Sequence, residues 1–500
     1  MLPAPDRAAF LEAYEAGRPQ VVWTTFVADL ETPVSALLKL AHGRPYAFLL
    51  ESVEGGAVRG RYSIIGMKPD LVWRCRGARA EINRRARAER DAFEPEPLPS
   101  LDSLRALLGE SRIAMPPGLP PPAAGLFGYM AYDMVRLVER LPESKPDPLG
   151  LPDAVFVRPS IVAVFDNLAD SVTLVTPVRP EPGLSGPRAW ELARERLAEA
   201  VEEFDRGIRH EPPRREAVAV TPRAHTSPEA FEAMVRRCKE YIAAGDAFQI
   251  VVSQRFSVPF DLPPLSLYRA LRRLNPSPFL FFLDLDGFAL VGSSPEILVR
   301  LRDGKVTIRP LAGTRRRGTT REEDEALAAE MLADPKERAE HLMLLDLGRN
   351  DVGRVAEVGT VRVTEKMVVE RYSHVMHISS NVEGMLRPGL DALDALIAGF
   401  PAGTVSGAPK VRAMEIIEEL EPFRRGFYAG TVGYFAADGS MDTCIGLRTA
   451  LVKDGEMIVQ AGAGIVHDSD PAAEHQECLN KARALIRAAE EAVRFASRGR

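Results

Sequence analysis

The sequence predicts an α+β fold in which large antiparallel sheets are flanked by helices. Asp-Gly pairs stand between alternating apolar runs at 286–287, 303–304, 438–439 and 454–455. Both residue types tolerate a positive φ, so each pair is typical of a two-residue hairpin, and hairpins join antiparallel strands. Stretches with helical character lie near 229–244, 322–347, 408–420 and 471–496. This alternation favours α+β over a parallel Rossmann-type sheet.

Proline-rich segments divide the first half of the chain. Those at 93–100, 115–125 and 177–187 are interpreted as loops. An amphipathic stretch runs from about 188 to 208, and the segment 209–229 that follows is polar and Pro-rich without a helical period. We place a domain boundary there, which gives an N-terminal domain of residues 1–210 and a C-terminal domain of residues 225–496.

The composition indicates a cytoplasmic protein that binds neither nucleic acid nor membranes. The 500 residues are 46% apolar and 27% charged, with a net charge of −6, which does not favour an anionic partner. No apolar run approaches the ~20 residues of a membrane span, and the N-terminus lacks the features of a signal peptide. The four cysteines form no CxxC pair, so neither a disulfide framework nor a zinc site is indicated.

Two similar segments each carry a pair of glutamates three residues apart. They read DPKERAEH at 334–341 and DPAAEHQE at 470–477. In each, Asp suits the N-cap and Pro the first helical position. Residues three apart share one helix face, so Glu337 pairs with Glu340 and Glu474 with Glu477. One pair alone is explained by a capping box or the helix dipole. Two matched pairs favour a cation between them, and all-oxygen ligation suits Mg²⁺.

The run Gly462-Ala463-Gly464 lies between a predicted strand at 457–461 and the second glutamate helix. Small residues allow backbone N–H groups to approach an anion closely, so a carboxylate or phosphate cradle is one interpretation. A tight strand-to-helix turn is the other. A dinucleotide fingerprint would need a third glycine where His467 stands, and no P-loop motif occurs.

Further polar residues are candidates for anion binding or proton transfer. Arg448 and Tyr428 are predicted on strands, where together they can bind a carboxylate. His377 and His374 alternate on another predicted strand, and a histidine near a site can act as general acid. The arginines within RPLAGTRRRGTTR, 309–321, form either a phosphate-binding patch or a solvated loop beside an acidic helix.

At this point the sequence resembles the chorismate-utilising enzymes. The motifs that carry the resemblance, in order, are RPLAGTRRRG, ERAEHLMLLDLGRND, YSHVMHISS, PAGTVSGAPK, GFYAGTVGY, MDTCIGLRTA and GAGIVHDSDPAAEHQE. They cover roughly residues 225–495, and FLLESVEGG…GRYSIIG near the N-terminus is similar to the regulatory domain of anthranilate synthase large subunits. The resemblance implies a two-domain α+β fold around a β-sandwich, an N-terminal tryptophan-binding domain and a C-terminal chorismate-binding domain.

The resemblance also implies how chorismate and Mg²⁺ are bound. Glu340 and Glu477 resemble direct Mg²⁺ ligands, and Glu337 and Glu474 resemble partners that act through water. The ion would hold the ring carboxylate, supported by Lys481. The residues that resemble binders of the enolpyruvyl carboxylate are Tyr428, Arg448, Gly462, Ala463 and Gly464. Gly313 and Thr314 resemble a further substrate contact.

The implied reaction has two stages. Ammonia adds to ring C2 while the C4 hydroxyl leaves, and pyruvate is then eliminated to leave the aromatic product, anthranilate. His377 is the expected general acid with Thr404 beside it, and Glu296 is the candidate base. This would be the first committed step of tryptophan biosynthesis.

Two positions favour anthranilate synthases over other chorismate enzymes. Ala312 stands where aminodeoxychorismate synthases usually have lysine, and Gln249 stands where isochorismate-forming relatives have a water-activating lysine. Two alternatives stay open: aminodeoxychorismate synthase component I and a non-catalytic tryptophan-binding regulator. No cysteine lies in a GxCxG glutaminase turn, so glutamine use would require a separate amidotransferase subunit, expected in an α₂β₂ complex.

Feedback inhibition by L-tryptophan is the last expectation from the resemblance. The family's pocket combines an LLES motif with NPSPYM. The corresponding tryptophan-binding residues here are Glu51, Ser52, Pro278, Phe279 and Leu280. Phe279 and Leu280 replace the usual Tyr and Met, and both keep an apolar wall.

Overall fold

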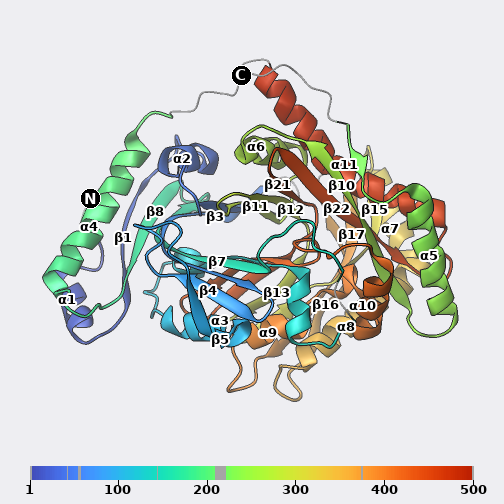
Figure 1. The fold of residues 1–500 in the computed structure, drawn as a ribbon, viewed down its shortest axis with the longest axis horizontal. Helices are drawn as coiled ribbons and strands as arrows, with labels where there is room; N and C mark the ends of the chain where they lie inside the picture. The colour runs from blue at the N-terminus through green and yellow to red at the C-terminus, as the bar shows by residue number, and fades with distance from the viewer. Residues whose placement is uncertain are drawn as a thin grey trace.

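The computed structural model describes residues 3–41, 43–54, 58–142, 145–208, 221–372 and 375–497. Within them, antiparallel strands from both halves of the chain are hydrogen-bonded into one continuous sheet system, with helices outside it (Figure 1). The predicted α+β class is confirmed. No helix in these ranges is long and apolar enough to cross a membrane.

The strands of the first half lie at β1 Gln20–Val27, β2 Phe48–Glu54, β3 Val58–Arg76, β4 Arg79–Asn83, β5 Glu94–Pro99, β6 Gly125–Met130, β7 Ala154–Asp166 and β8 Ser171–Val178. They pair in the order β1–β8–β7–β3–β2, with β6 also on β7 and β4 between β3 and β5.

The strands of the second half lie at β9 Arg223–Ala224, β10 Gln249–Pro259, β11 Phe279–Asp284, β12 Ala289–Ser294, β13 Ile297–Arg302, β14 Lys305–Ile308, β15 Leu311–Arg316, β16 Arg362–Arg371, β17 Val375–Met385, β18 Gly407–Ala408, β19 Thr431–Ala436, β20 Met441–Ile445, β21 Thr449–Lys453 and β22 Glu456–Ile465. One path of pairings runs β10–β22–β21–β12–β11–β2–β3. A second runs β17–β14–β13–β20–β19–β6–β7.

These two paths are the layers of a sandwich. They join where β3 pairs with β7, and one apolar cluster contains residues of both layers, such as Phe281 of β11 and Val432 of β19. Because β2 pairs with β11 and β6 with β19, both halves of the chain contribute to each layer. The expected boundary at 209–229 falls mostly outside the described residues.

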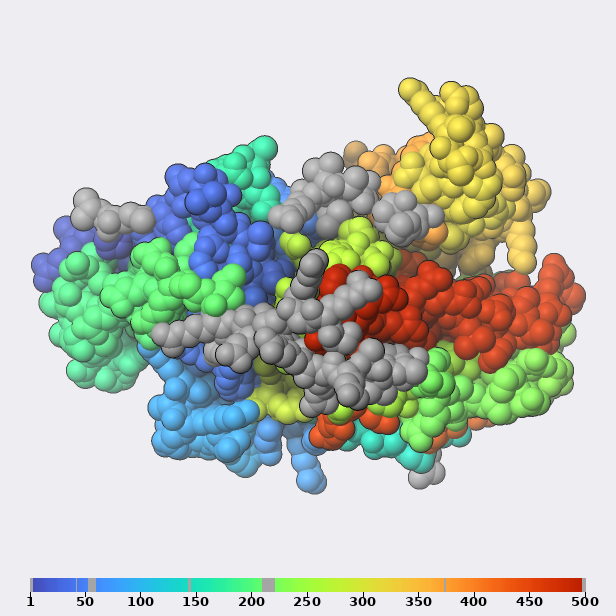
Figure 2. Space-filling view, turned by 90° about the horizontal axis from the view of Figure 1, so that it is seen from above, coloured from blue at the N-terminus to red at the C-terminus, as the bar shows by residue number. Residues whose placement is uncertain are grey.

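Helices cover the outer faces of the sheets. They lie at α1 Arg7–Glu15, α2 Pro33–Leu40, α3 Ser100–Glu110, α4 Gly186–Asp205, α5 Pro228–Ala243, α6 Pro264–Leu274, α7 Arg321–Ala333, α8 Pro335–Gly353, α9 Ala392–Gly399, α10 Lys410–Leu420 and α11 Pro471–Ser497, with short 3₁₀ turns at Pro121–Ala123, Tyr132–Leu137 and Gly403–Val405. Figure 1 places α1 and α4 at one side of the molecule and α5 at the other, with α6 near the top centre against α11. In the space-filling view, the yellow segment of α7 and α8 stands beside the red α11 (Figure 2).

Three of the four predicted hairpin turns have the expected form. Both residues have positive φ at Asp286-Gly287, Asp303-Gly304 and Asp454-Gly455. At Asp438-Gly439 only the glycine does, and the Ala436 N–H donates to the Ser440 carbonyl, so three residues form the turn.

Two predicted boundaries were wrong. The helical stretch at 322–347 is interrupted at Asp334, which ends α7 and caps α8. The segment expected as a loop at 93–100 contains β5, an exposed strand that pairs only with β4 among the described strands. Proline is tolerated on such an edge because one side of the strand needs no N–H donor.

Candidate active site

A cavity of about 460 Å³ lies where α8 and α11 meet β10, β15, β17 and β22. It brings together residues that are far apart in the sequence. The predicted catalytic, metal and substrate residues that line it are Glu296, Gly313, Thr314, Glu337, Glu340, His377, Thr404, Tyr428, Arg448, Gly462, Gly464, Glu474, Glu477 and Lys481. Ala463 does not line it, because its side chain packs in an apolar cluster with Ile250 and Cys478.

The glutamate pairs stand in the first two turns of α8 and α11, as expected. Asp334 caps α8 by accepting from the backbone N–H of Lys336 at 2.9 Å, and Asp470 accepts from the N–H of Ala473 at 2.9 Å. These caps, with proline at the next position, start both helices beside the cavity. The carboxylates at the next turns therefore face one space from two sides.

The four carboxylates interact electrostatically. Burial raises the pKa of Glu340, and Glu337 and Glu477 raise it further. Burial also raises the pKa of Glu474, with a contribution from Glu477. Arg315 lies 2.7 Å from Glu337, and Lys481 lies 2.7 Å from Glu477. In this arrangement no group of three or more His, Cys, Asp or Glu side chains among the described residues could hold a metal ion.

His377 on β17 also lines the cavity. Its Nδ1 is 2.8 Å from the carbonyl of Gly313 and 3.1 Å from the hydroxyl of Thr314. A carbonyl only accepts, so Nδ1 carries the proton and Nε2 is left as the acceptor nitrogen. Burial lowers the pKa of His377 to about 4, so the imidazole is neutral at physiological pH. His374 lies outside the described residues.

The buried Glu296 and the half-buried Arg448 also line the cavity and are electrostatic neighbours. Burial raises the pKa of Glu296 to about 8, although Arg448 favours the charged form. Burial lowers the pKa of Arg448, and the guanidinium makes no hydrogen bond or ion pair with the rest of the described chain. A cationic side chain of this kind is suited to an anionic ligand.

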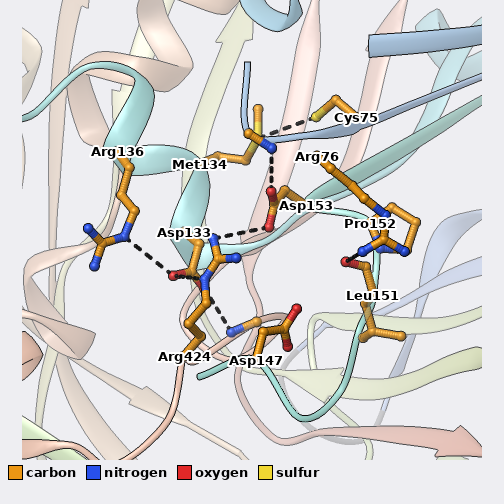
Figure 3. Close-up of polar contacts among 12 residues, drawn as sticks. Cys75, Arg76, Asp133, Met134, Arg136, Asp147, Leu151, Pro152, Asp153 and Arg424 are labelled. Atoms are coloured by element: carbon orange, nitrogen blue, oxygen red, sulfur yellow. Dashed lines mark hydrogen bonds and ion pairs between the residues drawn. The ribbon is translucent and has the colours of Figure 1, made fainter. Parts of the chain in front are cut away.

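Tyr428 and Arg448 do not lie on strands, contrary to the prediction. Tyr428 is in the turn before β19, and Arg448 is in a bend before β21 with a φ of 47°. The turn of Tyr428 is anchored to the first half of the chain (Figure 3). Arg424 donates to Asp133 at 2.9 Å, and the N–H of Gly426 donates to the same carboxylate at 3.1 Å.

The run 462–464 is neither a cradle loop nor a turn, because it forms part of β22, where it pairs with residues 251–253 of β10. Other residues lie close to both glycines. A Cβ on Gly462 would lie 2.6 Å from the hydroxyl of Tyr428, and one on Gly464 would lie 2.7 Å from Nε2 of Gln249. The predicted strand at 457–461 therefore continues to Ile465.

The arginine cluster at 309–321 is neutralised by acidic side chains. Its ion pairs are Arg309 with Glu365 and Glu370, Arg315 with Glu330, Asp334 and Glu337, Arg316 with Glu323, Arg317 with Asp324, and Arg321 with Glu325. The phosphate-patch interpretation therefore gains no support. Three of the five arginines belong to or directly follow β15.

Some lining residues had not been singled out from the sequence. Lys336 stands inside the motif DPKERAEH and lines the cavity beside Glu337. Gln460 also lines it and donates to the buried Ser253 at 2.8 Å. Lys336 could have been noticed by its place in the motif, whereas nothing local to Gln460 marks it.

A second cavity of about 890 Å³ contains all five predicted tryptophan-binding residues in its lining. The carboxylate of Glu51, however, is engaged elsewhere. It accepts from the hydroxyl of Tyr268 at 2.5 Å and from Arg272 at 2.6 and 2.8 Å. Glu51 is thus tied to α6.

Comparison with known proteins agrees with this arrangement. A family profile described as chorismate binding enzyme matches residues 64–487. Anthranilate synthase component 1 of Cereibacter sphaeroides is 59% identical over 494 residues, which cover 98% of both chains. That of Thermus thermophilus is 51% identical over 472 residues, covering 94% of this chain and 97% of its own. The crystal structure of anthranilate synthase component I from Streptococcus pneumoniae superposes with a TM-score of 0.76 at 36% identity, covering 92% of this chain and 99% of that one. The chain therefore belongs to the chorismate-binding enzymes and, within them, to the anthranilate synthase component 1 family.

Proposed function

We propose that this chain converts chorismate and ammonia to anthranilate and pyruvate in the first cavity. The proposal rests on the acidic and basic side chains that line this cavity together. Acidic side chains from α8 and α11 line the cavity, and so do Tyr428 and the half-buried Arg448, whose guanidinium has no hydrogen-bond or ion-pair partner in the described part of the chain. A dicarboxylate such as chorismate fits this arrangement if a cation joins one carboxylate to the acidic wall and the arginine binds the other.

The donor set fits Mg²⁺. Glu340 and Glu477 would hold the ion, with Glu337 and Glu474 beside them, because mutually repelling carboxylates with raised pKa values are stabilised by a divalent cation. When bound, Mg²⁺ would neutralise and orient the ring carboxylate. Glu337 is ion-paired with Arg315, and Glu477 is ion-paired with Lys481. Both ion pairs would have to rearrange when the ion binds.

The protonation states favour roles opposite to those expected for His377 and Glu296. Glu296 is mostly protonated at neutral pH and is suited to donate a proton to the departing C4 hydroxyl, which leaves as water. His377 is neutral with an acceptor nitrogen and is suited to take the C2 proton before pyruvate leaves. The buried hydroxyl of Thr404 lies close enough to Glu296 to favour the charged form of that carboxyl.

The proposed domains, inhibitor and partner subunit follow from the resemblance to the family. Residues 225–496 would form the chorismate-binding domain and residues 1–210 a regulatory domain, with L-tryptophan as the inhibitor in the second cavity. A separate glutamine amidotransferase subunit would supply ammonia in an α₂β₂ complex, because no cysteine lies in a glutaminase motif. All four cysteines are free and buried, which is compatible with the cytoplasm.

Anthranilate fluorescence from the purified chain with chorismate, Mg²⁺ and ammonium tests the proposal. We expect a signal that EDTA and Glu340→Gln abolish, while Glu325→Gln, which removes an exposed carboxylate paired with Arg321, leaves it intact. Consumption of chorismate without anthranilate would instead indicate an aminodeoxychorismate synthase component. Tryptophan binding without chorismate consumption, even with the amidotransferase subunit added, would indicate a regulator.

A further inference from the structure

The two cavities share a wall. Pro295 lines both of them, Glu296 lines the first and Ile297 lines the second. Pro295 and Glu296 connect β12 to β13, and Ile297 is the first residue of β13. A ligand in the second cavity would therefore contact the residues on either side of Glu296, the buried acid that lines the first cavity.

Tyr372 forms another part of this wall. It is buried, lines the second cavity, and packs edge to face with the imidazole of His377, with 5.6 Å between ring centroids and 62° between ring planes. The imidazole of His377 lines the first cavity. One aromatic side chain thus separates a ligand in the second cavity from the histidine of the first.

The hydroxyl of Tyr372 is fixed from the side of the second cavity. It donates to Glu370 at 2.6 Å, and Glu370 accepts from Nε of Arg309 at 2.6 Å. Both charged residues line the second cavity. An amino acid brings an ammonium and a carboxylate, which are the groups that compete for a carboxylate–guanidinium pair. Its binding would therefore disturb the contact that holds the tyrosine ring.

We infer that Tyr372 positions His377 and transmits occupancy of the second cavity to the first. The inference rests on the proposed function, in which the second cavity takes L-tryptophan. Ligand binding at Glu370 and Arg309 changes the position of the ring, and the ring changes the orientation of the imidazole. Inhibition then requires no large rearrangement of the sheets.

The first test is the coupling between the two ligands. The Kd of L-tryptophan is measured by calorimetry with and without saturating chorismate, in Mg²⁺ and without ammonia so that no anthranilate forms. For the unaltered chain we expect saturating chorismate to raise the Kd of L-tryptophan by at least about tenfold, a ratio within the usual range of allosteric coupling. Tyr372→Phe keeps the ring but loses the bond to Glu370, and its ratio should fall below about threefold. The matched control is Tyr434→Phe, since Tyr434 lines the second cavity but its ring contacts Phe127; its ratio should stay that of the unaltered chain.

The second test does not depend on tryptophan. Tyr372→Leu uncovers the imidazole, so the acid limb of kcat/KM should move from about pH 4 toward the ordinary histidine value near 6.5. Arg448, Lys481 and Glu370 still face the ring in this variant, so the shift reports the loss of the aromatic cover. Tyr434→Phe should not move the limb.

The outcomes separate the inference from the proposal on which it rests. An unchanged coupling ratio in Tyr372→Phe, with tryptophan still bound, would overturn the transmitting role. An unmoved acid limb in Tyr372→Leu would overturn the positioning role. If the unaltered chain binds no tryptophan, the assignment of the second cavity fails and the transmitting role fails with it, whereas a shifted limb would still support the positioning of His377.

Discussion

Lys481 and Glu477 form an ion pair one turn apart on α11. The ammonium of Lys481 lies 2.7 Å from the carboxylate and donates to the carbonyl of Gly462 at 2.8 Å. The lysine thus neutralises a carboxylate that faces Glu340 across the cavity. A divalent cation at Glu340 and Glu477 must compete with this ammonium.

Lys481→Met should therefore strengthen Mg²⁺ binding and weaken chorismate binding. Removing a positive charge beside Glu477 should tighten the Mg²⁺ Kd by about tenfold, since ~1.4 kcal/mol suffices for that factor. The KM for chorismate should rise, because a cation that faces the ligand is lost. Calorimetric Mg²⁺ titration and steady-state kinetics measure the two effects. Lys453→Met, which breaks an ion pair with Asp454 at a hairpin, is the control, and an Mg²⁺ affinity that falls in Lys481→Met would contradict the competition.

The two glycines of β22 should differ in their tolerance of alanine. In Gly462→Ala the new Cβ meets the Val252 carbonyl at 2.8 Å and the Tyr428 hydroxyl, so backbone must move. In Gly464→Ala it meets only the end of the Gln249 side chain. We expect Gly462→Ala to lose about 1–3 kcal/mol of stability, typical of overpacking, and to raise the chorismate KM at least tenfold. Gly464→Ala should lose less stability and should raise the chorismate KM by a smaller factor. Urea unfolding and kinetics compare them, and equal effects would refute the packing argument.

Features set by neighbouring residues were predictable from the sequence. The Asp-Pro starts of α8 and α11 and the Asp-Gly turns depend on caps and φ preferences within a few residues. Features set by distant residues were not. Glycines are poor strand formers, yet 462–464 is held in β22 by pairing with β10, about 200 residues earlier.

The candidate site shows the same division. Spacing placed each glutamate pair on one helix face and the matched pairs favoured a shared cation, whereas the resemblance to a family supplied the substrate residues that line the same cavity. The turn conformation of Tyr428 depends on anchors such as Asp133, which comes from the other half of the chain. The shared wall at Pro295 and Tyr372 arises from three-dimensional packing that no motif records.

Glu296→Gln should remove an alkaline limb from the pH profile. Because the pKa of Glu296 is about 8, its acid form is present below that pH and is lost as the pH rises through it. The rate per free ammonia should therefore fall above pH 8 in the unaltered enzyme. Glutamine donates no proton, so the rate should fall by about 10²–10⁴-fold and the limb should vanish. Glu325→Gln serves as the control, and a persisting limb in Glu296→Gln would assign it to another group.

His341 should make the fold sensitive to acid. It is fully buried, its Nε2 lies 2.6 Å from the hydroxyl of Ser380, and burial lowers its pKa to about 4. The folded state thus favours the neutral ring, so stability is complete above pH 6.5 and is lost as the pH falls toward 4. The loss at pH 4 is roughly 3 kcal/mol, from 1.36 kcal/mol per pKa unit. His341→Gln should flatten the dependence of urea unfolding between pH 6.5 and 4. His467→Gln, at an exposed histidine, should not.

Arg425 and Glu421 form a buried ion pair that holds several walls of the first cavity. Arg425 is 2% exposed, donates to Glu421 at 2.6 and 2.9 Å, and donates to the carbonyls of Val251 and Val405 at 2.6 Å each. Its guanidinium lies 5.4 Å from the ring centre of Tyr428. Removing one member leaves the other charge buried without its partner, which costs about 3–5 kcal/mol.

Arg425→Met should therefore reduce the free energy of unfolding by about that amount and raise the chorismate KM through Tyr428. Glu421→Gln in the same chain should restore part of the stability, because the amide oxygen still accepts from Ser253 and no uncompensated carboxylate remains. A double-mutant cycle in urea measures the coupling, and additive losses would show that the two charges act independently. The matched exposed pair is Arg237 with Glu240, and Arg237→Met should leave the unfolding midpoint unchanged, because solvent screens that pair.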